Sequence, residues 1–257
     1  MSFNAEHTAY VYGYPKTGRT WLRYMIAASI SEQYELGIEV DYDNMYSIIP
    51  NRAEEHIDGQ PLALDSSDSL PLVMMSHENY SDTTLLDRPH IFTTRDPRDI
   101  MTSHWLHDTK HIRGLFSGNL TEYLESEHGL QRFVKHISSW SKILTEDSVI
   151  AYEDLNRNPL ETFTAICNKL EIEISPEIIA TIVQASSIEN LQQKEKTSPL
   201  AGQEYDTTDP NALRFRKGTI GDHENYFSEQ NHEQVAVAIK SLNKEALYIV
   251  EMTGYPV

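Results

Sequence analysis

The stretch Gly13-Tyr14-Pro15-Lys16-Thr17-Gly18-Arg19-Thr20-Trp21 stands between a short apolar run and a segment of helical period. The apolar run, Ala9–Tyr12, predicts a strand, and the spacing of apolar side chains in Thr20–Ser31 predicts a helix. The free N–H groups at the start of such a helix, together with its dipole, attract anions. The sequence therefore predicts an anion-binding loop in this first β–α unit.

The loop matches the nucleotide-binding P-loop pattern G-x-x-x-x-G-K-[ST] at Gly13, Gly18 and Thr20. Arg19 stands at the position of the usual lysine, and Lys16 lies three residues earlier. Both cations add positive charge where backbone donors converge, which favours phosphate binding. The alternative interpretation is a glycine-containing β–α turn whose cations are solvated.

Short apolar runs alternate with longer segments of helical period along the rest of the chain. Further strands are predicted at Leu72–Met75, Ile91–Thr94 and Val149–Tyr152. Further helices are predicted from Pro97 through Trp105, at Leu130–Leu144, Pro159–Leu170 and Pro176–Ala185, and from the N-cap Ser228 toward Met252. This alternation predicts one α/β domain over residues 1–257, a P-loop-like parallel β-sheet flanked by α-helices on both faces. The polar stretch Gln192–Phe227 has little period, and loops of that length inside compact domains are uncommon unless functional or disordered.

The composition limits the kinds of partner that the protein can bind and the cellular compartment in which we expect it. The 257 residues include 21 basic and 39 acidic side chains, a formal charge of −18, which disfavours nucleic acid or an anionic membrane as partner. No apolar run approaches the ~20 residues of a membrane span. Residues 1–14 lack the basic and apolar regions of a secretory signal, and the single cysteine, Cys167, cannot form an intramolecular disulfide. We therefore expect a cytoplasmic protein that binds any anionic ligand through a local concentration of cations.

Five further segments follow the loop in an order that a known family shares. They are the strand ending at His77, the segment Thr94–Ser103, the pair of segments Tyr152–Asp154 and Ser186–Leu191, and the stretch Arg214–Phe227. Together with the loop they resemble the sulfotransferases of the cytosolic type, which use 3′-phosphoadenosine-5′-phosphosulfate (PAPS). The resemblance covers Tyr14 to Phe227. Ile188 replaces an aromatic residue of the family pattern, and His223 replaces a tryptophan.

The resemblance implies a set of residues for each part of PAPS. The 5′-phosphosulfate would be bound by Lys16, Thr17, Gly18, Arg19 and Thr20. The adenine would be bound by Trp21, Tyr152, Ser187 and Ile188, with Trp21 as the main platform. The 3′-phosphate would be bound by Arg95, Ser103, Arg216, Lys217 and Gly218.

The resemblance also implies a reaction: a sulfuryl group passes in line from PAPS to a hydroxyl or amine of a small-molecule acceptor, without a metal, leaving adenosine 3′,5′-bisphosphate (PAP). Lys16 would stabilise the leaving group and His77 would act as general base. A lone histidine after a strand is more often structural, so this role depends on the resemblance. Met75 replaces a lysine that the cytosolic family often has near the sulfonate. Either Arg19 supplies that charge, or stabilisation depends more heavily on Lys16.

Two other functions stay open from the residues alone. One is a P-loop kinase that uses ATP on a small molecule, and the other is a nucleotide-binding module without turnover. His104, His107 and His111 have a spacing that metal ligands can use, but no fourth ligand is evident, and a polar or acceptor-pocket face is favoured.

The acceptor pocket is expected in the parts of the chain outside these motifs. The candidate parts are Tyr42–Tyr46, Tyr80, Trp105 and the Gln192–Leu213 loop, and their aromatic content suits a small phenol, alcohol or amine. Of the basic residues, Lys16, Arg19, Arg95, Arg98, Arg214, Arg216 and Lys217 fall in the three windows of expected PAPS contact. The sequence therefore predicts one basic cleft within an acidic protein.

Overall fold

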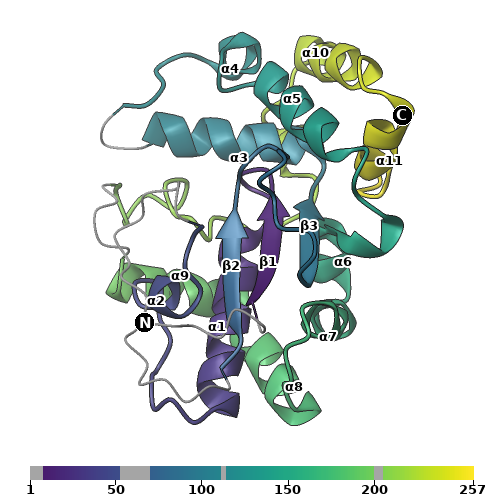
Figure 1. The fold of residues 1–257 in the computed structure, drawn as a ribbon. Coiled ribbons are helices and arrows are strands. Elements are labelled where there is room, and N and C mark those ends of the chain that lie inside the picture. Colours follow the sequence, from purple (N-terminus) through teal and green to yellow (C-terminus); the bar gives the residue numbers. More distant parts are fainter. Residues whose placement is uncertain (1–7, 53–69, 111–113, 200–204) are drawn as a thin grey trace.

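The computed structural model of the chain describes residues 8–52, 70–110, 114–199 and 205–257. Within them, parallel strands form a sheet in the order β2-β1-β3-β4 (Figure 1). The strands are β1 (Thr8–Gly13), β2 (Leu72–Ser76), β3 (His90–Thr94) and β4 (Val149–Ala151). β2 and β3 lie on opposite sides of β1, so the chain changes direction across the sheet after β2. The carboxyl end of β1 is therefore a topological switch point, the place where α/β sheets bind ligands.

Successive residues of β1 belong to two different cores, one on each face of the sheet. Ala9 and Val11 pack in one hydrophobic core, and Tyr10 and Tyr12 pack in the other. The first core is built with α1 (Arg19–Gln33), α2 (Met45–Ile48), α6 (Tyr152–Arg157), α7 (Pro159–Lys169), α8 (Pro176–Ala185) and α9 (Ile188–Thr197). The second is built with α3 (Pro97–Lys110), α4 (Leu120–Glu125), α5 (Leu130–Trp140), α10 (Glu229–Lys240) and α11 (Lys244–Glu251).

Figure 1 shows the sheet between these two groups of helices. This arrangement confirms the predicted α/β class, the parallel sheet and the helices on both faces. The longest described helix, α1, has 15 residues, and within the described ranges no helix is both long and apolar enough to cross a membrane.

Several predicted boundaries differ from the structure. The fourth strand ends at Ala151, and Tyr152 is the first residue of α6. The predicted helix Leu130–Leu144 ends at Trp140. The predicted C-terminal helix is two helices: Ser228 caps α10 as expected, and Asn243 then caps α11 by accepting the Ala246 N–H at 2.8 Å.

The polar stretch Gln192–Phe227 is not wholly irregular, because α9 extends to Thr197. This helix was missed because Leu191 and Glu195 are its only fully buried positions, which leaves too few apolar residues to show a period. From Tyr205 to Gly221 the described chain has no helix or strand, and a 3₁₀ turn follows at Asp222–Asn225.

Candidate active site

The β1–α1 loop has no room for side chains at its two glycines. Gly13 has a φ of 153°, and a Cβ there would lie 2.3 Å from Thr93 Oγ1. Gly18 has a φ of 85°, and a Cβ there would lie 2.6 Å from Cδ2 of the Tyr152 ring. The glycines therefore allow the loop to approach β3 closely and bring the Tyr152 ring to the start of α1.

One cavity of about 580 Å³ is lined by residues from the loop and from α1, α3, α6, α9 and the irregular segment. With the exception of Thr17, it brings together all the residues predicted for the site: Lys16, Gly18, Arg19, Thr20, Trp21, His77, Arg95, Ser103, Tyr152, Ser187, Ile188, Arg216, Lys217 and Gly218. The Thr17 hydroxyl is buried; it donates to the Tyr14 carbonyl at 2.9 Å and lies 2.8 Å from Thr93 Oγ1. The Thr17 side chain thus holds the loop on β3, and only its backbone N–H is left for the predicted role.

His77 lies just beyond the end of β2, with Nδ1 2.8 Å from the Gly13 carbonyl oxygen. A carbonyl only accepts, so Nδ1 carries the proton and the lone pair of the neutral ring is on Nε2. Burial and then the Arg19 cation hold the pKa of His77 well below its usual value, although the Gly13 hydrogen bond acts in the opposite direction. His77 is therefore neutral near pH 7, with a basic nitrogen at Nε2.

Lys16 has a backbone φ of 73°, an unusual conformation for a residue other than glycine. Burial and then the Arg214 cation hold the pKa of the Lys16 amine well below its usual value, and Asp108 opposes them. A bound anion would oppose the same effects, because it favours the protonated amine. The loop thus places a strained, half-buried lysine where an anion would favour its charged form.

Arg95, Tyr152 and Trp21 all line the cavity, and the Tyr152 ring lies next to the other two side chains. The Arg95 guanidinium lies 4.2 Å from the centroid of the Tyr152 ring and donates to the Thr219 carbonyl at 3.1 Å. The Trp21 ring meets the Tyr152 ring edge-on at 6.1 Å, and its Nε1 donates to the Ser186 carbonyl at 3.1 Å. The two rings provide an aromatic surface beside a buried cation.

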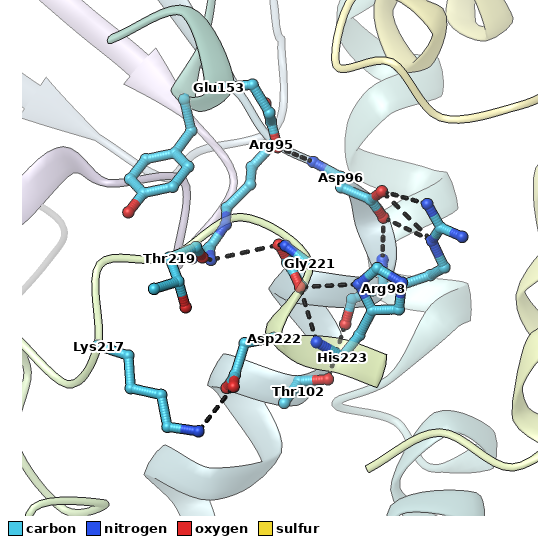
Figure 2. A network of polar contacts seen from close by, with 12 residues as sticks. Arg95, Asp96, Arg98, Thr102, Glu153, Lys217, Thr219, Gly221, Asp222 and His223 are labelled. Atoms are coloured by element: carbon cyan, nitrogen blue, oxygen red, sulfur yellow. Dashed lines mark hydrogen bonds and ion pairs between the residues drawn. The ribbon is translucent and has the colours of Figure 1, made fainter. Parts of the chain in front are cut away.

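The segment Arg214–His223, here named the clamp, is held by two buried carboxylates. At its end, Gly221 and His223, both labelled in Figure 2, donate to Asp99 of α3: the Gly221 N–H at 2.8 Å, and the N–H and Nδ1–H of His223 at 3.0 and 2.9 Å. At its start, Glu195 of α9 accepts the N–H of Arg214 at 2.7 Å and that of Phe215 at 3.0 Å. These carboxylates accept hydrogen bonds from backbone N–H groups, which in a helix or strand would donate to backbone carbonyls.

Two side-chain amides hold carbonyls in the middle of the clamp. Gln192 donates to the Arg216 carbonyl and Asn156 to the Gly218 carbonyl, each at 2.6 Å. Two cations of the clamp pair with Asp222, which lies 2.6 Å from Arg216 Nη1 and 2.7 Å from Lys217 Nζ.

One predicted cleft cation lies elsewhere. Arg98 does not line the cavity; its guanidinium pairs with Asp96 at 2.6 Å and lies 4.8 Å from the centroid of the Tyr255 ring. The reason is local, because Asp96 is only two residues away, directly before α3, and Arg98 is in the first turn of that helix.

Met75 is fully buried in the core and does not line the cavity. Arg19 does line it, and the Arg19 cation lowers the pKa of His77. This placement favours the first of the two alternatives for the missing lysine, namely that Arg19 supplies the charge.

The residues expected around the acceptor divide into two groups. Tyr42 and Tyr46 line the cavity. Tyr80 instead packs on Trp140 with ring centroids 5.7 Å apart, and Trp105 donates to the Gly118 carbonyl at 3.1 Å.

His104 and His107 also line the cavity, as a polar acceptor-pocket face would, whereas His111 lies outside the described residues. His107 Nδ1 lies 2.8 Å from Asp108 Oδ1. In the part of the chain that the structure describes, no group of three or more His, Cys, Asp or Glu side chains is arranged to hold a metal ion.

Sequence reasoning missed Arg23, Asn51 and Asn156, which also line the cavity. A signal was present for Arg23, because it lies one helical turn after Arg19 and so shares its face of α1. Asn51 and Asn156 carry no such signal, since a single asparagine in a loop or short helix is unremarkable.

Comparison with known proteins identifies the family. A sequence model of the sulfotransferase domain matches residues 7–248. The chain is 24% identical over 251 residues to the 3-alpha-hydroxysteroid sulfotransferase of Cavia porcellus, covering 95% of this chain and 83% of that one. It is 23% identical over 258 residues to the flavonol 3-sulfotransferase of Flaveria bidentis, covering 91% and 81%.

Solved structures share the fold. Mouse sulfotransferase SULT7A1 complexed with PAP superposes with a TM-score of 0.64 at 18% identity, covering 98% of this chain and 91% of that one. Retinol dehydratase in a complex with retinol and PAP gives a TM-score of 0.65 at 16% identity, covering 93% and 82%. Since the domain match spans nearly all of residues 1–257, the chain belongs to the sulfotransferase domain family.

Proposed function

We propose that this sulfotransferase transfers a sulfuryl group from PAPS to a hydroxyl or amine of a small-molecule acceptor, without a metal. The observation that carries the proposal is the convergence on one cavity of the Lys16 loop, Arg95, the clamp and a neutral His77. Structural neighbours were solved with PAP, and one of them with androsterone or retinol, which supports the nucleotide and the class of acceptor.

The charges of the lining residues suit those of PAPS. The start of α1, with Lys16 and Arg19, suits the 5′-phosphosulfate, because helix N-termini and adjacent cations bind anions. Arg95 and the clamp suit the 3′-phosphate, for which a guanidinium provides a matching pair of donors.

The adenine would lie between these two anion sites. Trp21 and Tyr152 offer rings there, and Ser187 and Ile188 line the same wall. Ser103 of α3, which also lines the cavity, would add a hydroxyl donor to the 3′-phosphate.

His77 and Lys16 would carry the chemistry. The acceptor oxygen forms a bond to sulfur as the bond from sulfur to the 5′-phosphate oxygen breaks, and PAP leaves with that electron pair. The acceptor proton passes to Nε2 of His77, whose Nδ1–H stays on the Gly13 carbonyl. The Lys16 ammonium would offset the negative charge that grows on the leaving oxygen.

Nucleotide binding gives the first test. PAP should bind at least about 100-fold more tightly than AMP, because AMP lacks the group that would meet two or more charge-assisted donors. Binding and turnover should both survive EDTA. Equal affinity for PAP and AMP would contradict the proposal, and a requirement for ATP and Mg²⁺ would indicate a kinase instead.

Turnover gives the second test. His77→Ala should lower kcat by about 10²- to 10⁴-fold while the Kd of PAP stays within about twofold, since a general base contributes to the reaction and not to donor binding. Lys16→Ala should lower kcat as well. A wild-type protein that binds PAP but turns over no acceptor in a broad panel would be a binding module.

We also propose a cytoplasmic location and a single-domain organisation. The buried lone thiol of Cys167 and the sharing of one sheet by both cores support these two points.

A further inference from the structure

Arg23 is a buried cation without a carboxylate partner among the described residues. Only 4% of it is exposed; its guanidinium lies 4.0 Å from the centroid of the Tyr46 ring and donates to Asn51 Oδ1. Two other arginines that line the cavity do have a carboxylate partner: Arg95 lies 3.5 Å from Asp99, and Arg216 lies 2.6 Å from Asp222. Arg23 therefore contacts an aromatic ring and an amide, whereas Arg95 and Arg216 each contact a negative charge.

A buried guanidinium without a counter-charge is unfavourable. Arginine stays protonated at any physiological pH, so Arg23 cannot avoid the desolvation cost by losing its proton. Buried charges in proteins are accordingly paired or bound to ligands. An anion beside Arg23 would relieve this cost.

Arg23 and its hydrogen-bond partner Asn51 each have one N–H donor with no acceptor among the described residues. They are Nε of Arg23 and Nδ2 of Asn51, and both side chains line the cavity. Each belongs to a planar group, and the hydrogen bond between the two residues joins these groups. A pair of planar N–H donors is the complement of the two oxygens of a carboxylate.

Rigid elements support both donors. Arg23 is in α1, and the segment around Asn51 is paired with β2: Met75 donates to the Pro50 carbonyl at 3.1 Å, and Arg52 donates to the Met75 carbonyl at 3.0 Å. The donors are thus preorganised and not on a free surface loop.

The position of Arg23 belongs to the acceptor side of the cavity. It lies one turn of α1 beyond Arg19, away from the start of the helix, beside Tyr46 and outside every segment that resembles a donor motif. Its cation also lowers the pKa of His77, which places it within electrostatic range of that ring.

We propose that the acceptor of this enzyme carries a carboxylate, which Arg23 and Asn51 bind while its hydroxyl or amine lies at His77. The inference depends on the proposed function and adds the class of acceptor to it. Tyr42 and Tyr46 provide ring surface for the body of such a molecule. A single carboxylate also suits a protein of net charge −18, which would repel a polyanion.

Matched pairs of acceptors test the proposal. Phenolic and aliphatic hydroxy acids are compared with their primary amides, which have the same shape without the charge, using PAPS as donor. The wild type should prefer the acids by about 10- to 100-fold in kcat/KM, the usual range for a hydrogen bond to a charged group. Arg23→Gln should remove this preference, and Arg23→Lys should restore part of it, with the Kd of PAP unchanged in both.

Asn51→Asp gives a second variant that does not remove a buried group. It supplies Arg23 with an internal carboxylate, so it should abolish the preference for acids while keeping the protein folded. Equal use of acids and amides by the wild type, or a preference that survives in Arg23→Gln and Asn51→Asp, would overturn the proposal. So would a loss of affinity for PAPS but not PAP in Arg23→Gln, because Arg23 would then serve the donor.

Binding separates this inference from the proposed function. If the wild type turns over none of the acceptors, the same pairs are added to the PAP complex and its melting temperature is measured. Stabilisation by the acids alone supports the carboxylate site, and equal or absent stabilisation contradicts it. Failure of PAP to bind better than AMP in the same preparation would instead show that the proposed function is wrong.

Discussion

Asp99 and His223, 124 residues apart in the sequence, are joined by two hydrogen bonds: Asp99 Oδ1 accepts the backbone N–H of His223 at 3.0 Å and its Nδ1–H at 2.9 Å. Asp99 is 1% exposed. Burial would raise the pKa of its carboxyl, but the His223 hydrogen bonds and the Arg95 cation outweigh it and lower the pKa to about 2. The carboxylate therefore stabilises the fold and the clamp together.

Replacing Asp99 by Asn should lower the free energy of unfolding at pH 7 by about 2 kcal/mol, the equivalent of the lowered pKa. Because the folded pKa is below the unfolded value, this contribution is present above about pH 4 and disappears as the pH falls toward 2. Urea unfolding at pH 7 measures it, and PAP binding should weaken in the same variant. The control is Asp154→Asn, whose ion pair with Arg157 is exposed and should contribute less than about 0.5 kcal/mol.

The protein should lose stability as the pH falls below about 6.5. Burial lowers the pKa of His104 and of His136 to about 3 each, so only the unfolded chain binds protons there between about pH 6.5 and 3. Each histidine should reduce the free energy of unfolding by about 2 kcal/mol between pH 7.5 and 5. Denaturation at the two pH values measures the loss. It should shrink by that amount in His136→Gln and stay unchanged in the control His128→Gln; an equal loss in all three proteins would contradict the explanation.

Gly18→Ala should weaken both the fold and PAP binding, since its Cβ would lie 2.6 Å from the Tyr152 ring in a backbone of φ 85°. Gly37→Ala separates the effect of the positive φ from that of the steric contact, because Gly37 has a φ of 66° and nothing within 4 Å of the added Cβ. The control should lose only the backbone term of about 1 kcal/mol and keep its PAP affinity. Similar results for the two variants, by urea unfolding and calorimetric titration, would show that the Tyr152 contact is unimportant.

Glu195→Ala should loosen the start of the clamp. Its carboxylate accepts the N–H groups of Arg214 and Phe215 and the hydroxyl of Tyr205, so the variant leaves three donors without an acceptor. We expect a loss of about 2–3 kcal/mol, and a smaller loss for Glu195→Gln, which keeps one acceptor oxygen. Unfolding and the Kd of PAP are the measurements. If Gln and Ala lose equal amounts, the oxygen acceptors are not what holds the segment.

The sequence predicted the sheet and the principal helices because these elements have a clear hydrophobic period. Where the period is weak the prediction failed: α9 buries a glutamate in place of an apolar residue, and α2 has only four residues. The break between α10 and α11 was missed for another reason. Asn243 acts as a cap, and that role depends on where the preceding helix ends.

Site residues were predictable where a motif fixes their spacing, which is why the loop, Arg95 and the clamp cations meet as expected. Arg98 shows the limit, since its aspartate partner could not be identified from spacing alone. Residues such as Asn51 reach the cavity through pairing with β2, a tertiary contact that no local pattern encodes.

The clamp contains no β-strand, and this has a kinetic consequence. A strand in its place would exchange nucleotide only by breaking a ladder shared with the sheet. Side chains from α3 and α6 hold the end of the clamp instead, so the part from Gly218 to His223, beyond the core residue Phe215, can detach without breaking the sheet. We expect the amide protons of Gly221 and His223 to exchange with solvent faster than those of β1, and this opening to set the residence time of PAP on the enzyme.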